Sequence, residues 1–159
     1  MLSPYRVLDL TDERGQLAGA TLADLGAEVI LVEPPDGSRS RRLPPFVAGR
    51  EGDPEASLWF WSYNRGKRSI SMDLDDPADR GRFLELVAGA DIVLESDRPG
   101  AMAERGLGYD ELAAVNPEIV VTSISPFGQS GPKADWAATD LTVAAAAMVP
   151  KMTGDEDRA

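Results

Sequence analysis

The sequence contains neither cysteine nor histidine among its 159 residues. The missing cysteine excludes disulfides, thiolate nucleophiles and cysteine-based metal sites. The missing histidine excludes Ser-His-Asp and Cys-His catalysis, histidine-ligated zinc and imidazole acid–base chemistry. Chemistry carried by these residues must therefore use carboxylates, Lys, Tyr, Ser or Thr.

Long apolar runs are also missing. No stretch of 18 or more apolar residues exists, so we expect no transmembrane helix. The N-terminus lacks a charged segment followed by an apolar one, so no secretory signal is visible. The length is that of one domain. These features predict a single-domain, cytoplasmic protein.

The net charge of −11 is strongly acidic. Binding to nucleic acids or anionic membranes depends on many cations, so we expect neither as a partner. The cations are unevenly spread, because seven of the sixteen lie within thirty residues. An acidic chain with one basic section favours a single anionic small molecule over a polymer. The seven are Arg39, Arg41, Arg42, Arg50, Arg65, Lys67 and Arg68.

The densest part of this section is the basic run, residues 64–73, in which three cations surround Gly66 and precede an alternating segment. A cationic loop that leads into a strand suits an anionic ligand, of which phosphate is the commonest. A solvated surface turn accounts for the same residues equally well. The run by itself leaves both interpretations open.

Hydrophobic periodicity predicts strands over 5–11, 28–33, 68–73, 91–95 and 119–124. Helices are predicted over 16–25, 76–87 and 109–115, with a last one through residue 148 that Asp135 or Thr139 caps. Residues 34–62 show no clear period, although their aromatic cluster at 59–63 argues for burial rather than disorder. Alternating strands and helices indicate an α/β fold with an open, mostly parallel sheet and flanking helices.

Ligands of such sheets bind outside the carboxyl ends of the strands. That rule places four polar segments on one rim, and their arginines and small residues favour an anionic, nucleotide-containing ligand. The segments are 12–15, 33–42, 96–100 and 125–131.

Three motifs have plainer alternatives. Gly15 and Gly19 are four apart rather than two, which favours close helix–sheet packing over NAD binding. The acids at 73, 75, 76 and 79 suit helix capping better than a metal site. The glycine-rich loop 127–132 lacks the lysine of a P-loop, so nucleoside triphosphate hydrolysis has no support.

Taken together, the blocks of this sequence resemble the N-terminal part of the family III CoA-transferases, the carnitine dehydratase and bile-acid-inducible type. The resemblance is collinear over nearly the whole chain. It rests on 7–11, 22–30, 32–34, 64–69, 72–74, 90–95, 98–100, 106–109, 116–117, 123–125 and 127–132.

The resemblance implies a Rossmann-like large domain, of which residues 1–159 are an incomplete N-terminal part, and an interlocked homodimer. It implies transfer of CoA between carboxylic acids through an aspartyl-CoA thioester, with acyl-CoA as substrate and no cofactor. Arg14, Arg98 and Arg105 would meet phosphates, while Met72 and Leu74 would flank the adenine. The implied CoA contacts are Glu13, Arg14, Met72, Asp73, Leu74, Asp75, Ser96, Asp97, Arg98, Arg105, Ser125, Pro126, Phe127 and Gly128.

Departures from the family pattern leave the function open. Asp97 and Asp75 replace uncharged and basic residues, which weakens a phosphate site. The family's nucleophilic aspartate lies beyond the turn at 153–154, and neither Asp155 nor Asp157 has its context, so we expect no catalytic residue in this chain. The alternatives are an inert CoA- or nucleotide-binding module and a subunit of a heteromer completed by a partner chain. A related racemase is disfavoured, because Thr139 stands where those enzymes have histidine.

Overall fold

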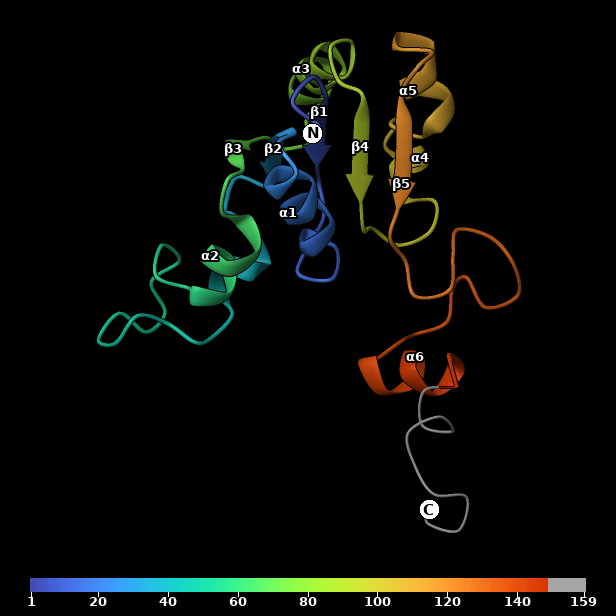
Figure 1. Cartoon of the computed structure of the whole chain (residues 1–159). Coiled ribbons are helices and arrows are strands. Elements are labelled where there is room, and N and C mark those ends of the chain that lie inside the picture. The colour runs from blue at the N-terminus through green and yellow to red at the C-terminus, as the bar shows by residue number, and fades with distance from the viewer. Residues whose placement is uncertain (149–159) are drawn as a thin grey trace.

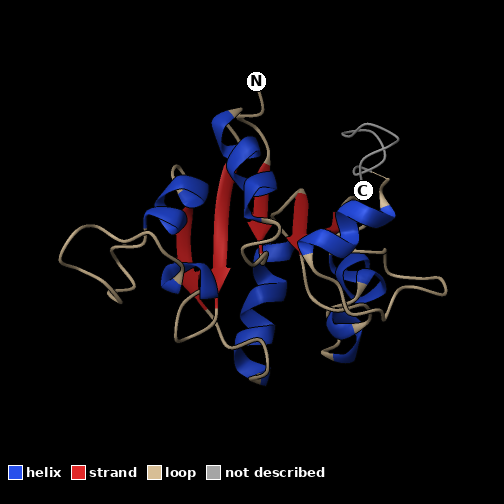
Figure 2. Ribbon diagram, turned by 90° about the horizontal axis from the view of Figure 1, so that it is seen from below, coloured by secondary structure: helices blue, strands red, loops and turns tan. Residues whose placement is uncertain are grey.

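The computed structural model describes residues 1–148, so Asp155 and Asp157 lie outside the described residues. Five parallel strands form one sheet in the order β3-β2-β1-β4-β5 (Figure 1). The sheet is open and has helices around it, as the sequence predicts (Figure 2). The strands are β1 (Arg6–Asp9), β2 (Glu28–Glu33), β3 (Arg68–Ser71), β4 (Ile92–Glu95) and β5 (Val120–Ser123).

Seven helical segments connect and follow these strands in the described part of the chain. They are α1 (Gln16–Asp24), the 3-10 helix η1 (Arg39–Arg42), α2 (Leu58–Asn64), α3 (Pro77–Val87), α4 (Ala101–Glu104), α5 (Tyr109–Val115) and α6 (Asp140–Ala146). No helix among residues 1–148 combines the length and apolar character that crossing a bilayer requires.

The hydrophobic core has two parts, one on each face of the sheet. Side chains alternate along β1, so that Leu8 belongs to one cluster and Val7 to the other. The Leu8 cluster includes Phe83 of α3 and Leu112 of α5, both fully buried. The Val7 cluster packs beneath α1, with Leu22 among its partly buried members. The central strand is thus buried on both faces, as in parallel sheets.

The predicted helix ends are confirmed where a side chain or a glycine specifies them. Asp76 caps α3, since its carboxylate accepts from the backbone N–H of Ala78 and Asp79 at 2.8 and 3.2 Å. Thr139 caps α6 in a reciprocal capping box with Thr142. Gly26, just after α1, has φ 99°, a left-handed conformation that glycine adopts without strain.

The region 34–62 departs most from expectation. It contains η1 and begins α2, neither of which the sequence predicts, because segments of four and seven residues are too short to establish a period. The aromatic cluster at 59–63 is less buried than the sequence predicts. Trp61 is 48% exposed, and Trp59, Phe60 and Tyr63 are only partly buried. Helix α4, of four residues, is missed for the same reason as η1.

Candidate functional site

All four predicted polar segments meet at the carboxyl end of the sheet. Arg14 donates to the Ser96 carbonyl at 2.7 Å, which joins the turn after β1 to the turn after β4. Arg39 forms an ion pair with Glu13 at 3.3 Å, which joins η1 to the same turn. Gln129 donates to the Glu95 carboxylate at 3.2 Å. The rim inferred from topology is therefore one continuous surface.

The basic run lies beside this rim, but its cations are not free. The side chain of Lys67 is 1% exposed and forms an ion pair of 2.8 Å with Asp9, which is fully buried. Arg65 and Arg68 form exposed ion pairs with Asp24 and Glu28. The proposal of a cationic anion-binding loop therefore does not fit these contacts.

Lys67 is instead part of a polar network beneath the rim. Its ammonium group also donates to the Gln16 carbonyl and the Asn64 side chain, both at 2.9 Å. Asn64 in turn donates to the Gln16 side chain at 3.0 Å. Burial lowers the pKa of Lys67, against the raising effect of Asp9. The network fixes the end of α2 against the start of α1 and the end of β1.

A cavity of about 210 Å³ opens at the carboxyl ends of β1, β2 and β3, and we call it the acidic cavity. Its apolar wall comes from Leu10, Val32, Met72 and Leu74. Val32 belongs to the Leu8 cluster, and the other three pack against it. Six predicted CoA contacts line it together: Met72, Asp73, Leu74, Asp75, Asp97 and Arg105. Glu33 and Pro34 complete the lining.

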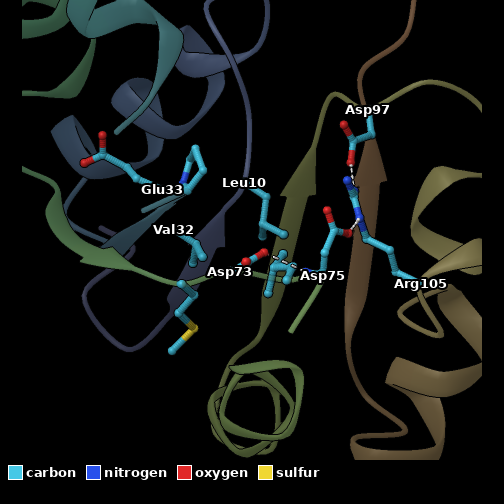
Figure 3. A pocket seen from close by; sticks show the side chains of 10 residues that line it. Leu10, Val32, Glu33, Asp73, Asp75, Asp97 and Arg105 are labelled. Carbon is cyan, nitrogen blue, oxygen red and sulfur yellow. Dashed lines mark hydrogen bonds and ion pairs between the residues drawn. The ribbon is translucent and has the colours of Figure 1, made fainter. Parts of the chain in front are cut away.

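Arg105 joins two loops across this cavity. Its Nε donates to Asp75 at 2.8 Å and its Nη1 donates to Asp97 at 2.5 Å. Figure 3 shows the guanidinium between the two carboxylates. The hydrogen bond to Asp75 raises the pKa of Arg105. Glu33, on the other side of the cavity, is paired with Arg41 at 2.6 Å, and its carboxylate points away from the other labelled side chains (Figure 3).

A second cavity, of about 380 Å³, lies between the loop after β5 and α6, and we call it the Arg14 cavity. Three predicted contacts line it: Arg14, Ser125 and Pro126. The Ser125 hydroxyl is buried and has no hydrogen-bond partner within residues 1–148. Arg14 is engaged with Asp12 at 2.6 Å, and this hydrogen bond raises the pKa of Arg14.

The other predicted residues lie on the same rim without lining these two cavities. Ser96 is buried and its hydroxyl donates to Asp12 at 2.9 Å. Arg98 is paired with Glu104, and Phe127 packs edge-to-face on Trp136 at 6.2 Å. Glu13 has one carboxylate oxygen buried without a partner, and Gly128 is exposed.

Sequence reasoning missed several lining residues. Leu10 and Val32 belong to the acidic cavity but carry no polar signal, and only their place at strand ends marks them. Thr139, Asp140 and Val143 belong to the Arg14 cavity, although none of them is among the CoA contacts predicted from the sequence. Within residues 1–148, no cluster of three or more acidic side chains is arranged to hold a metal ion.

Comparison with known proteins decides the family. The family model described as CoA-transferase family III matches residues 2–159. The chain belongs to CoA-transferase family III.

Two curated relatives of this CoA-transferase family illustrate the match. The chain is 43% identical over 143 residues to the succinyl-CoA:(R)-benzylsuccinate CoA-transferase subunit BbsE of Thauera aromatica, with 90% of this chain and 35% of that protein covered. It is 40% identical over 159 residues to a succinate–glutarate CoA-transferase of Agrobacterium fabrum, with 98% and 40% covered.

A solved structure supports the fold. The crystal structure of a CaiB/BaiF family protein from Brucella suis matches with a TM-score of 0.87 at 37% identity, covering 99% of this chain and 42% of that one. The chain thus spans between 35% and 42% of the length of these three proteins.

Proposed function

We propose that this chain forms the CoA-binding N-terminal part of an enzyme that transfers CoA between carboxylic acids. The observation that carries the proposal is the acidic cavity, where six side chains that the sequence nominates for CoA gather at the carboxyl rim of the sheet. Relatives in the same family are named as CoA-transferases for succinate, glutarate and benzylsuccinate.

In this proposal the chain binds and orients the substrate. The apolar wall of the cavity packs against a flat heterocycle, and the rim loops contact the sugar and phosphates. Transfer proceeds through an aspartyl-CoA thioester, a carboxylate-nucleophile mechanism that needs neither histidine nor cysteine. We place that aspartate outside residues 1–159, in line with the greater length of the relatives. An interlocked homodimer and a cytoplasmic location remain predictions from the family resemblance and the composition.

Calorimetric titration of the purified chain with CoA tests the binding step. We expect saturable binding that Met72→Gln weakens about tenfold or more, because an amide replaces part of the apolar wall. Met102→Gln is the matched control, since Met102 also packs against the Leu8 cluster but lines a different cavity. No heat at millimolar CoA, or equal loss of affinity in both variants, would contradict the proposed site.

The second candidate is a subunit of a heteromeric CoA-transferase. The name of the Thauera aromatica relative, which calls that protein a subunit, favours this possibility. Purification from source cells distinguishes a heteromeric enzyme from an enzyme made of one kind of chain. The heteromer is supported if this chain purifies with a different chain at fixed stoichiometry and only that complex has CoA-transferase activity. It is contradicted if the active fractions contain a single chain species.

A further inference from the structure

The acidic cavity has a charge balance that is unfavourable for phosphate. Its lining contains one cation, Arg105, and the carboxylates of three aspartates at 73, 75 and 97, which leaves a balance of −2. Glu33 adds little to this balance, because its carboxylate is 4% exposed and neutralised by Arg41. An anionic group that enters the cavity therefore meets net repulsion.

Arg105 offsets this repulsion only in part, because two of its five N–H donors already hold carboxylates of the protein. Asp75 and Asp97 hold Nε and Nη1 from the two loops on either side of the guanidinium. The side chains of Arg105 and Asp97 are 32% and 45% exposed, so this pair is partly shielded from water. A phosphate that binds Nε or Nη1 displaces one of these carboxylates, and a phosphate that approaches another donor of the guanidinium still meets both carboxylates nearby.

The same lining is favourable for a different chemical group. The wall of Leu10, Val32, Met72 and Leu74 is apolar and suits one face of an aromatic heterocycle. Carboxylates around it accept hydrogen bonds from amino and hydroxyl groups. An aminated base with its sugar satisfies both features, whereas a phosphate satisfies neither.

We propose that Asp75 and Asp97 are specificity-determining residues, which direct the acidic cavity to the uncharged, hydrogen-bond-donating base and sugar of a nucleotide ligand and hold its phosphates outside. This inference rests on the proposed CoA site. It predicts that the two aspartates weaken the binding of a ligand in proportion to its number of phosphates near the cavity.

Titration of Asp75→Asn and Asp97→Asn with adenosine, dephospho-CoA and CoA at low salt tests the inference. We expect each variant to bind CoA about five- to tenfold more tightly than the unsubstituted chain, dephospho-CoA by a smaller factor, and adenosine no more tightly. Glu118→Gln is the control for net charge. Glu118 is exposed and lies two residues before β5, at the end of the sheet opposite the rim.

The outcomes separate this inference from the proposed function. Equal CoA affinity in all four proteins overturns the role of the aspartates alone, and so does an equal gain for adenosine and CoA. A gain in Glu118→Gln as large as in the other variants reduces the effect to net charge and also overturns it. A set of proteins that binds none of the three ligands overturns the CoA site and the inference together.

Discussion

The close approach of α1 to Asp9 gives a sharp test of the buried ion pair. A Cβ atom at Gly19 would lie 2.1 Å from the Asp9 Oδ2 and 3.0 Å from the Lys67 Nζ. Asp9 has no room to withdraw, because its other oxygen accepts from the Thr11 backbone N–H at 3.0 Å and the Thr11 hydroxyl at 2.6 Å. Gly19→Ala must therefore separate the ion pair or push α1 away from the sheet.

The expected cost follows from the burial of this pair. Lys67 and Asp9 are 1% and 0% exposed, and disrupting a buried pair costs about 3–5 kcal/mol. Alanine improves helix propensity over glycine by about 1 kcal/mol. We therefore expect Gly19→Ala to lower the free energy of unfolding by about 2–4 kcal/mol.

Urea unfolding followed by far-ultraviolet circular dichroism measures this change. Gly81→Ala in α3 is the matched control, because Gly81 is exposed and a Cβ there meets nothing within 4 Å. The control should gain about 1 kcal/mol, so that the two glycine-to-alanine variants differ by about 3–5 kcal/mol. Two variants of equal stability would refute the close approach and the role assigned to Gly19.

Two further predictions concern substitutions of the charged residues themselves. Lys67→Ala should lower the free energy of unfolding by about 3–5 kcal/mol, because Asp9 stays buried without its partner. Arg65→Ala should lower it by at most about 1 kcal/mol, because the ion pair of Arg65 is exposed. Equal losses of the two variants in urea unfolding would contradict this distinction. Burial raises the pKa of Glu33, but hydrogen bonds from Arg41, Ser69 and Ser38 outweigh it and hold that pKa below 4.5. A lowered folded-state pKa stabilises the protein above pH 4.5, and this contribution is lost as the pH falls through 4.5 toward the folded-state pKa. Glu33→Gln should therefore have a free energy of unfolding about 2 kcal/mol lower than that of the unsubstituted protein at neutral pH. This difference should shrink when urea unfolding is repeated at pH values below 4.5. A difference that stays constant with pH would contradict the pairing of Glu33 with Arg41.

The sequence predicts the sheet well because its signals are local. Each buried strand is a short apolar run bounded by a turn, and parallel pairing follows from the helices between strands. The rim follows from the same topology, since parallel strands all end at one edge. Asp76 is identifiable as a cap, and Thr139 as one of two candidates beside Asp135, because a cap contacts backbone groups only two or three residues away.

The sequence could not predict which charges pair. Lys67 and Asp9 are 58 residues apart, and Arg105 lies 30 residues from Asp75. Nothing local distinguishes the buried Lys67 from its exposed neighbours Arg65 and Arg68. The sequence of the basic run therefore leaves an anion-binding loop and a solvated turn equally open, whereas the structure shows its three cations in intramolecular ion pairs.

These ion pairs bear on the proposed binding of an anionic ligand at the rim. Arg14, Arg98 and Arg105, the three arginines nominated for phosphates, are paired with Asp12, Glu104 and the Asp75–Asp97 couple. A phosphate that reaches any of them exchanges one ion pair for another, so its net electrostatic gain is the difference between two similar terms. If the proposed CoA site is correct, its affinity comes mainly from apolar contact and hydrogen bonding in the acidic cavity. We therefore expect substitutions in the wall around Met72 and Leu74 to weaken the proposed binding of CoA more than substitutions of the rim arginines.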